Sequence, residues 1–362
     1  PVEVAFYNGS GQEIQRDWYH KIDNKKKLSL PSGAVSARID PDHHMPDVNR
    51  SNNSSKKSLN LNFVWDKPTY FNHDVNIVPW LFSYNYYNGF TPGLTIFSGF
   101  APGYDGSGNV LSFLYDFNHK KPVGGFSITR PIRSISLFHV SSLNIKLDRG
   151  SGRTGFNAGI TGTIKEPYIK SPVARINANL FYHYLDSTAL DTVLYDDGKF
   201  FIMSLGYSKK WELNIDSELT FQIGIKTGKD FARSFLLGKV NHRFKKNIAT
   251  KIRLFASGFL YTRDLPLQYR TYLSGSIDPD FEQNILDRTG NSEAIQVLSH
   301  IFYDSGPGLR GLVKDVEGRP LATKKMAWSL RINQGLPYIK GDIFFDIGGI
   351  TEEKNPFIVS GL

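Results

Sequence analysis

The chain has 362 residues, a formal net charge of +9 and no cysteine. The absence of cysteine excludes a disulfide framework and any cysteine-ligated metal site. Because the basic residues are spread along many segments instead of forming an arginine-rich arm or a basic helix, the charge does not predict a nucleic-acid partner.

Aromatic residues and glycine are abundant, with 26 Phe, 18 Tyr, 5 Trp and 33 Gly. Aromatic side chains suit pleated strands, glycine suits turns, and no long window is rich in the residues that favour helices. No apolar run approaches the roughly eighteen residues that a membrane-spanning helix needs. The composition therefore predicts an all-β protein.

Short apolar segments bounded by turns open the chain, near residues 2–6, 18–22, 27–30 and 34–39. This pattern predicts part of a small β-sandwich within residues 1–53. Four strands are too few to form a stable two-layer core on their own, so we expect more of this domain, or a larger neighbouring domain, to precede Pro1. On this interpretation the chain is a fragment of a longer protein.

Residues 39–53 contain two prolines, three aspartates and three asparagines. Proline restricts φ, and Asp and Asn side chains bond to nearby backbone, so the segment favours turns and has little to bury. We predict a hinge between two differently built parts of the chain. Its turn-forming residues are expected to be Asp40, Pro41, Asp47, Asn49, Arg50, Asn52 and Asn53.

Catalytic motifs are not found: H-E-x-x-H, G-x-S-x-G, the P-loop and G-x-G-x-x-G have no match in the sequence. Each of these patterns places the groups of one chemistry at a defined spacing, so no catalytic residue is predicted. His43 and His44, beside Asp40, Asp42 and Asp47, form the one metal-like cluster. Neighbouring side chains would have to fold back on themselves to share an ion, and no metal site is predicted there.

Residues 54–78 are predicted to form a connector, and apolar and polar residues then alternate in long segments from residue 79 onward. The clearest case is the segment 174–185, because its apolar and polar residues fall on opposite faces of a strand. One face would carry Ile176, Ala178, Leu180, Tyr182 and Tyr184, and the other Arg175, Asn177, Asn179 and His183. Such strands suit either a soluble sandwich with its apolar face inside or a transmembrane barrel with its apolar face toward lipid.

The lengths of the predicted strands, the aromatic residues near their ends and the lengths of the connections favour the barrel. About ten tilted residues cross the hydrocarbon layer of a membrane. The segments that reach this length include 154–164, 173–185, 213–226 and 248–261. Aromatic residues gather near segment ends, and short turns such as 120–122 and 209–210 alternate with long loops such as 266–299, as in outer-membrane barrels.

We therefore predict an antiparallel transmembrane β-barrel over residues 79–362, with about twelve to fourteen strands. Its location would be the bacterial outer membrane and its partner the lipid of that membrane. The last residues, Ile358 to Leu362, lack the closing aromatic strand that such barrels commonly carry. We expect one or more strands to be missing at this end.

The N-terminal part resembles a known protein family in three stretches, Pro1–Val4, Val35–Asp42 and Asp47–Asn53. They look like the small β-sandwich that follows the catalytic domain in zinc aminopeptidases of the aminopeptidase N family, notably members that continue into an outer-membrane barrel. The resemblance implies a zinc centre, and peptide substrates, in a catalytic domain before Pro1. The zinc-binding H-E-x-x-H has no counterpart here, so no catalytic residue is transferred and no cofactor is expected in this chain.

A second resemblance lies near the C-terminus, in Arg310-Gly311-Leu312 and Phe344-x-Asp346-x-Gly348. It is similar to barrels of the bacterial surface-antigen superfamily, which carry an Arg-Gly pair on a loop folded into the lumen and an F-x-D-x-G strand motif. The resemblance implies that Arg310 bridges to strand groups such as Asp346 and that Gly311 lets the loop turn closely. Leu312 departs from the usual aromatic residue, and a coincidental turn beside an ordinary strand is the alternative.

Three functions remain open. The first is a non-catalytic anchor that holds a zinc aminopeptidase-like enzyme in the outer membrane. The second is a transport or assembly barrel of the surface-antigen type, with the N-terminal part as a periplasmic adaptor. The third is a soluble β-sandwich that binds carbohydrate or protein. Hydrolysis by this chain alone is not predicted.

Overall fold

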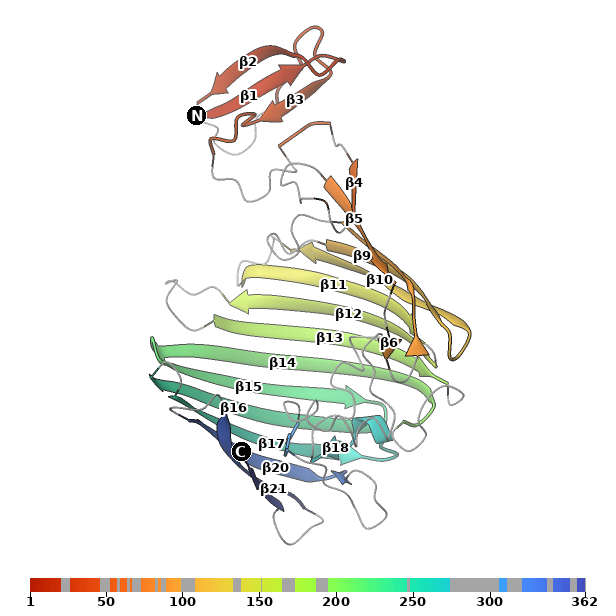
Figure 1. Ribbon diagram of the computed structural model, residues 1–362, viewed down its shortest axis with the longest axis vertical. Helices are drawn as coiled ribbons and strands as arrows, with labels where there is room; N and C mark the ends of the chain where they lie inside the picture. Colours follow the sequence, from red (N-terminus) through yellow and green to blue (C-terminus); the bar gives the residue numbers. More distant parts are fainter. Residues whose placement is uncertain are drawn as a thin grey trace.

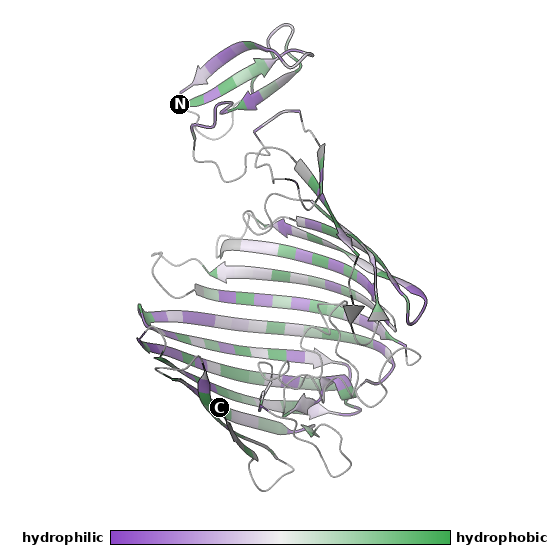
Figure 2. Ribbon diagram, viewed as in Figure 1, coloured by the Kyte–Doolittle hydropathy of each residue, from purple (hydrophilic) through white to green (hydrophobic). Residues whose placement is uncertain are grey.

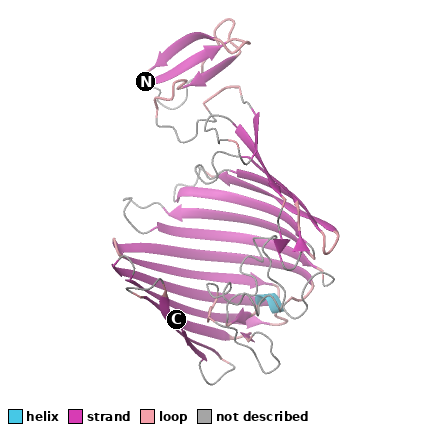
Figure 3. Cartoon of the chain, viewed as in Figure 1, coloured by secondary structure: helices cyan, strands magenta, loops and turns pink. Residues whose placement is uncertain are grey.

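The computed structural model is almost entirely β-structure (Figure 3), which confirms the all-β prediction. It describes residues 1–20, 27–45, 53–56, 59–63, 66, 73–81, 84–85, 89–98, 108–132, 138–150, 152–164, 173–186, 195–245, 248–273, 306–310, 321–336, 341–351 and 357–361. The helical structure within these ranges is a single 3-10 turn, η3 (Leu267–Tyr269). No helix in the described ranges is long and apolar enough to cross a membrane.

The N-terminal part is a three-stranded antiparallel sheet in the order β2-β1-β3. Its strands are β1 (Val2–Tyr7), β2 (Glu13–Tyr19) and β3 (Ser36–Ile39). The central strand β1 buries Val4, Ala5 and Phe6. The second strand was predicted near residues 18–22, but β2 begins earlier, at Glu13. Most of its residues are exposed and polar, so no hydrophobic pattern indicates where the strand begins. Residues 27–30, predicted as a strand, are irregular.

A fifteen-stranded sheet makes up most of the molecule (Figure 1), in the order β22-β21-β20-β17-β16-β15-β14-β13-β12-β11-β10-β9-β8-β5-β4. Its strands are β4 (Leu59–Phe63), β5 (His73–Trp80), β8 (Gly93–Ser98), β9 (Gly108–Asp116), β10 (Lys121–Pro131), β11 (Phe138–Gly150), β12 (Arg153–Ile164), β13 (Val173–Leu185), β14 (Gly198–Asn214), β15 (Ser217–Gly228), β16 (Phe231–Lys245), β17 (Ile248–Thr262), β20 (Met326–Gly335), β21 (Asp342–Ile350) and β22 (Phe357–Gly361). Neighbouring strands are antiparallel, except for the parallel pair β4 and β5. Two further antiparallel pairs join β6 (Tyr84–Asn85) to β7 (Gly89–Phe90) and β18 (Thr271–Tyr272) to β19 (Ala322–Thr323).

The two edges of this large sheet are β4 and β22, and within the described residues no strand pairing joins them. β4 and most of β5 come from the segment 54–78, which was expected to be a connector, and they extend the sheet at one edge. The predicted turn at 209–210 is wrong, because both lysines lie inside β14 and pair with β13 and β15. The turn falls instead at Ile215 and Asp216, where Asn214 Oδ1 accepts a hydrogen bond from the Asp216 N–H at 2.9 Å.

Figure 2 shows hydrophilic and hydrophobic residues alternating along many of the strands. Because successive side chains of a strand point to opposite faces, this alternation gives the sheet one apolar and one polar face. On β14, Phe201, Met203 and Leu205 project from the apolar face and are each about half exposed, at 52%, 51% and 53%. The strand register continues this apolar face from β8 to β22. Its exposed large side chains include Leu94, Phe113, Leu147, Ile160, Tyr182, Ile223, Leu236, Leu254, Trp328, Phe345 and Ile358.

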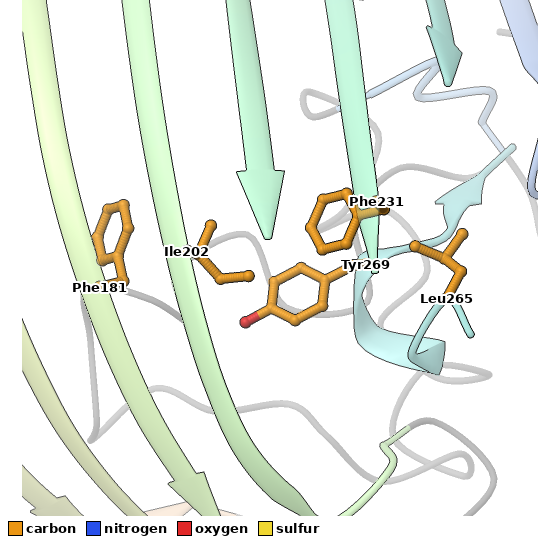
Figure 4. Close-up of a cluster of buried hydrophobic side chains, with 5 residues drawn as sticks. All are labelled: Phe181, Ile202, Phe231, Leu265 and Tyr269. Carbon is orange, nitrogen blue, oxygen red and sulfur yellow. The ribbon is translucent and has the colours of Figure 1, made fainter. Parts of the chain in front are cut away.

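The polar face is covered at one end by the segment that follows β17. Leu265 and Tyr269 pack there against Phe181, Ile202 and Phe231, which come from β13, β14 and β16 (Figure 4). The rings of Phe231 and Tyr269 stack with centroids 5.1 Å apart. A buried apolar cluster therefore holds part of the long loop against an otherwise polar sheet surface.

Candidate functional site

Asp346 and Arg310 form an ion pair on the polar face. Asp346 lies in the middle of β21 and is completely buried. Its Oδ2 accepts hydrogen bonds from the backbone N–H of Arg310 at 3.0 Å and from the Arg310 Nε at 2.8 Å. Its Oδ1 accepts a further bond from the Arg310 Nη2. This bidentate geometry fixes both the side chain and the backbone of Arg310.

Phe344 completes the contact with the guanidinium group. The centre of the Arg310 guanidinium lies 3.9 Å from the centroid of the Phe344 ring. Residues two apart in a strand point to the same face, so Phe344 and Asp346 reach the same arginine from one strand. The aromatic face and the carboxylate stabilise the same cation by different interactions.

Gly348, the next residue on this face of β21, allows the loop to come close. A Cβ at this position would lie 2.8 Å from the carbonyl oxygen of Trp328 and 3.1 Å from both Cδ atoms of Leu309. Real Cβ atoms do not tolerate the first of these distances, so only glycine fits without movement. The predicted contact between Arg310 and Asp346 is thus present, while Gly311 and Leu312 lie outside the described residues.

Several residues that sequence reasoning missed also hold the segment 306–310. Arg253 on β17 donates hydrogen bonds to the carbonyl oxygens of Pro307, at 3.0 Å, and Gly306. Ser329 on β20 donates to the Pro307 carbonyl as well. The period-two pattern of β17 and β20 would have placed both side chains on the polar face, but no spacing in the sequence links them to residue 307.

Leu309 anchors the same segment by apolar packing. It is fully buried in a cluster with Leu273, Ala327 and Ile350. Its N–H donates to the Leu273 carbonyl oxygen at 2.9 Å. The segment 306–310 is therefore attached to β17, β20 and β21 by hydrogen bonds, an ion pair and a small core.

The predicted hinge is described only in part. Asp40 is buried, has a positive φ of 47°, and accepts hydrogen bonds from the N–H groups of His44 at 2.7 Å and Met45 at 2.9 Å. Pro41 is also buried, and the backbone oxygen of Asn53 accepts the N–H of Ile39. Asp47, Asn49, Arg50 and Asn52 lie outside the described residues. Asp40 thus shapes a tight turn at the end of the N-terminal sheet.

One group of described residues has metal-like spacing: candidate ligand atoms of Glu3, Asp42 and His44 lie within 4.8 Å of one another. Arg16 already contacts both carboxylates, bridging to Glu3 at 3.1 Å and to Asp42, and it also pairs with Glu13 at 2.7 Å. Its hydrogen bond holds the pKa of the Glu13 carboxyl below the ordinary value, and it does the same for Asp42. The guanidinium takes the place that a cation would need, and no metal is assigned to this group.

Two cavities lined by described residues open on the polar face. The larger, of about 720 Å³, is lined mainly by amide, hydroxyl and glycine groups of β9 to β14, together with Lys146, Asp148 and Arg175. The smaller, of about 310 Å³, lies between β15, β16, β17 and β20. Both lie on the face that also holds the segment 306–310, so the cavities and the attached loop segment share one side of the sheet.

Comparison with protein-family models and with curated proteins finds no relative of this chain. A scan against protein-family models finds no match, and a search of curated proteins finds no similar sequence. Function is therefore inferred from the two faces of the sheet, from the loop contacts and from the resemblances in the sequence.

Proposed function

We propose that the chain is a membrane anchor, in which the large sheet closes into an outer-membrane β-barrel with its apolar face toward lipid. The observation that carries this proposal is the exposed apolar face that runs from β8 to β22. Soluble monomers rarely expose contiguous apolar patches beyond a few hundred Å². Here large apolar side chains from many neighbouring strands are exposed together.

The energetics favour lipid as the partner of this face. Moving a large apolar side chain from water into an apolar environment contributes about 1.5–3 kcal/mol. The opposite face carries buried charges such as Arg253, Arg331 and Asp346, which suit a hydrated interior and would be costly against lipid. Strands β10 to β17 contain 11–17 residues, enough to cross the hydrocarbon layer when tilted.

Closure of the sheet would remove its two edges. Unpaired N–H and C=O groups along β4 and β22 cannot be solvated by lipid, so a membrane-inserted sheet has to pair them. In our proposal the edges pair with each other or with further strands of the parent protein. The parent would carry a zinc aminopeptidase-like catalytic unit, so zinc and peptide substrates would belong to that unit and not to this chain.

Refolding into lipid vesicles tests the anchor. We expect the full chain to float with phosphatidylcholine vesicles after urea dilution and to migrate faster on gels when unheated than when boiled. Recovery in the soluble fraction with the same mobility in both samples would contradict the proposal and favour a soluble binding sandwich. The purified chain should also show no zinc-dependent hydrolysis of aminoacyl substrates, and such activity would contradict the anchor role.

A second candidate function, a transport or assembly barrel, is favoured by the segment 306–310 on the polar face. A loop held there by Arg310 and Asp346 could control access through the interior of a closed barrel. We expect Arg310→Ala to increase single-channel conductance in planar bilayers if the barrel transports. The absence of channels in both the original chain and this variant would favour the anchor role alone.

A further inference from the structure

The larger cavity on the polar face is lined mostly by neutral polar side chains. Its volume is about 720 Å³, and eight of its fifteen lining residues carry an amide or a hydroxyl group. The four amides belong to Asn144 on β11, Asn157 on β12, and Asn177 and Asn179 on β13. Small-molecule sites are usually lined by apolar side chains with a few polar groups. A lining made mainly of amides and hydroxyls therefore indicates a ligand whose own surface is polar.

Glycines on the neighbouring strands make room for two of these amides. Asn177 stands opposite Gly206 on β14, and Asn179 stands opposite Gly159 on β12. A Cβ at Gly206 would lie 2.5 Å from the Asn177 Oδ1, and a Cβ at Gly159 would lie 2.1 Å from the Asn179 Oδ1. Both amides therefore lie across the adjacent strand, in space that a larger residue would occupy, and the cavity stays open above them.

The amides offer donors and acceptors together. The Asn144 Nδ2 donates a hydrogen bond to the Thr129 Oγ1 at 2.9 Å, and this bond orients its amide. A side-chain amide can donate two hydrogen bonds and accept two, so further capacity remains for a ligand. A hydroxyl group also donates and accepts, whereas an ionised carboxylate only accepts and an ammonium group only donates. Hydroxyl groups are thus the ligand groups that match this lining best.

The charged residues of the lining are consistent with a neutral ligand. The Lys146 Nζ lies 3.7 Å from the Asp148 Oδ2, and the Nη2 of the buried Arg153 lies 3.4 Å from the same oxygen. Asp148 is thus already an ion-pair partner within the wall of the cavity. Arg175 is exposed, and its guanidinium N–H groups can donate to a hydroxyl oxygen.

We propose that this cavity binds a neutral ligand with several hydroxyl groups, of the chemical class of mono- and disaccharides. Amides and hydroxyls from neighbouring strands would pair with the ligand hydroxyls, and the glycines leave the space in which the ligand lies. The volume falls within the range for small-ligand sites. The site goes beyond the anchor role and does not depend on it, because it needs only the folded sheet.

An NMR titration with maltose, and separately with sucrose, tests the proposal on the full chain folded in a zwitterionic detergent. We expect saturable binding of at least one sugar. The double substitution Asn177→Ala and Asn179→Ala should weaken it about tenfold or more, because hydrogen bonds from two amides are lost. The matched control is Asn241→Ala with Asn333→Ala, which removes two amides from the lining of the smaller cavity. It should leave the affinity within about twofold.

The substitution Thr161→Val provides a second test that keeps the shape of the side chain. Thr161 lines the cavity and is exposed, so the change removes a hydroxyl group without altering a packed core. We expect sugar binding about threefold weaker, with the circular dichroism spectrum of the original chain. This variant decides the question if the double asparagine variant does not fold.

The dependence on salt separates recognition of hydroxyl groups from recognition of charge. Affinity for a neutral sugar should stay within about twofold between roughly 0.05 and 0.5 M sodium chloride, because screening acts on charges. A severalfold loss of affinity at the higher salt concentration would overturn the proposal. So would the absence of saturable binding of both sugars, or an affinity unchanged by the substitutions at Asn177, Asn179 and Thr161.

Discussion

Asp346 on β21 accepts hydrogen bonds from the backbone N–H, the Nε and the Nη2 of Arg310, so one buried carboxylate fixes an entire loop residue. The same carboxylate lies near Arg331, the residue opposite it on β20. Asp346 is therefore the common negative partner of a loop cation and a strand cation. Its removal affects both the attachment of the loop and the balance of charge on the polar face.

Asp346→Asn should strongly destabilise the folded chain. The substitution leaves Arg310 and Arg331 without their shared carboxylate in a buried position, and breaking buried pairs of this kind costs about 3–5 kcal/mol. Urea unfolding in detergent measures the change. Asp342→Asn, an exposed position on the same strand, is the control and should change the free energy of unfolding by less than about 0.5 kcal/mol.

Gly348→Ala should also destabilise the chain, by about 1–3 kcal/mol. The added methyl group would meet the backbone oxygen of Trp328 and the side chain of Leu309, so the loop or β21 has to shift. Gly238→Ala on β16 is the matched control, since a Cβ there meets nothing within 4 Å. Equal unfolding midpoints for both variants would show that the loop does not pack tightly against β21.

Leu205→Arg should impair insertion into vesicles, whereas Gln222→Arg should not. Leu205 projects from the apolar face of β14, which faces lipid in the proposed barrel, and an arginine in such a position costs about 2–4 kcal/mol near the membrane centre. The Gln222 side chain lies on the polar face of the neighbouring strand β15, opposite Ser208. The fraction of protein with fast mobility on unheated gels measures insertion, and similar losses in both variants would contradict the assignment of faces.

The N-terminal sheet should lose stability in acid. The hydrogen bond from Arg16 lowers the pKa of Glu13 and of Asp42 in the folded chain. Groups with a lowered folded pKa stabilise the fold above their unfolded pKa, about 4, and this contribution is lost as the pH falls through the folded value. Carboxyl NMR titration measures both groups, and Arg16→Gln should move both midpoints upward. Unchanged midpoints would show that Arg16 does not interact with them in solution.

Much of the large sheet could be predicted from alternation alone. The segments predicted at 173–185 and 248–261 correspond closely to β13 and β17. The F-x-D-x-G pattern also identified three residues of β21 that lie against the segment 306–310, although it did not include Ile350, which packs in the cluster with Leu309. The prediction failed where the local hydrophobic pattern was weak. β2 is mostly exposed and polar, so its start was predicted too late. Lys209 and Lys210 were predicted to form a turn because both are polar, although they lie within β14.

The sequence by itself determined the strands and their two faces, because side chains of an extended chain alternate and this period is visible in the order of residues. Only the tertiary structure decided that Arg253, Arg331 and Asp346 stand in one row and that Arg253 holds Pro307. These residues are far apart in the chain, and their contacts depend on the register between strands and on the path of the intervening loops. Register is set by the sum of pairings across the whole sheet, so no local pattern specifies it.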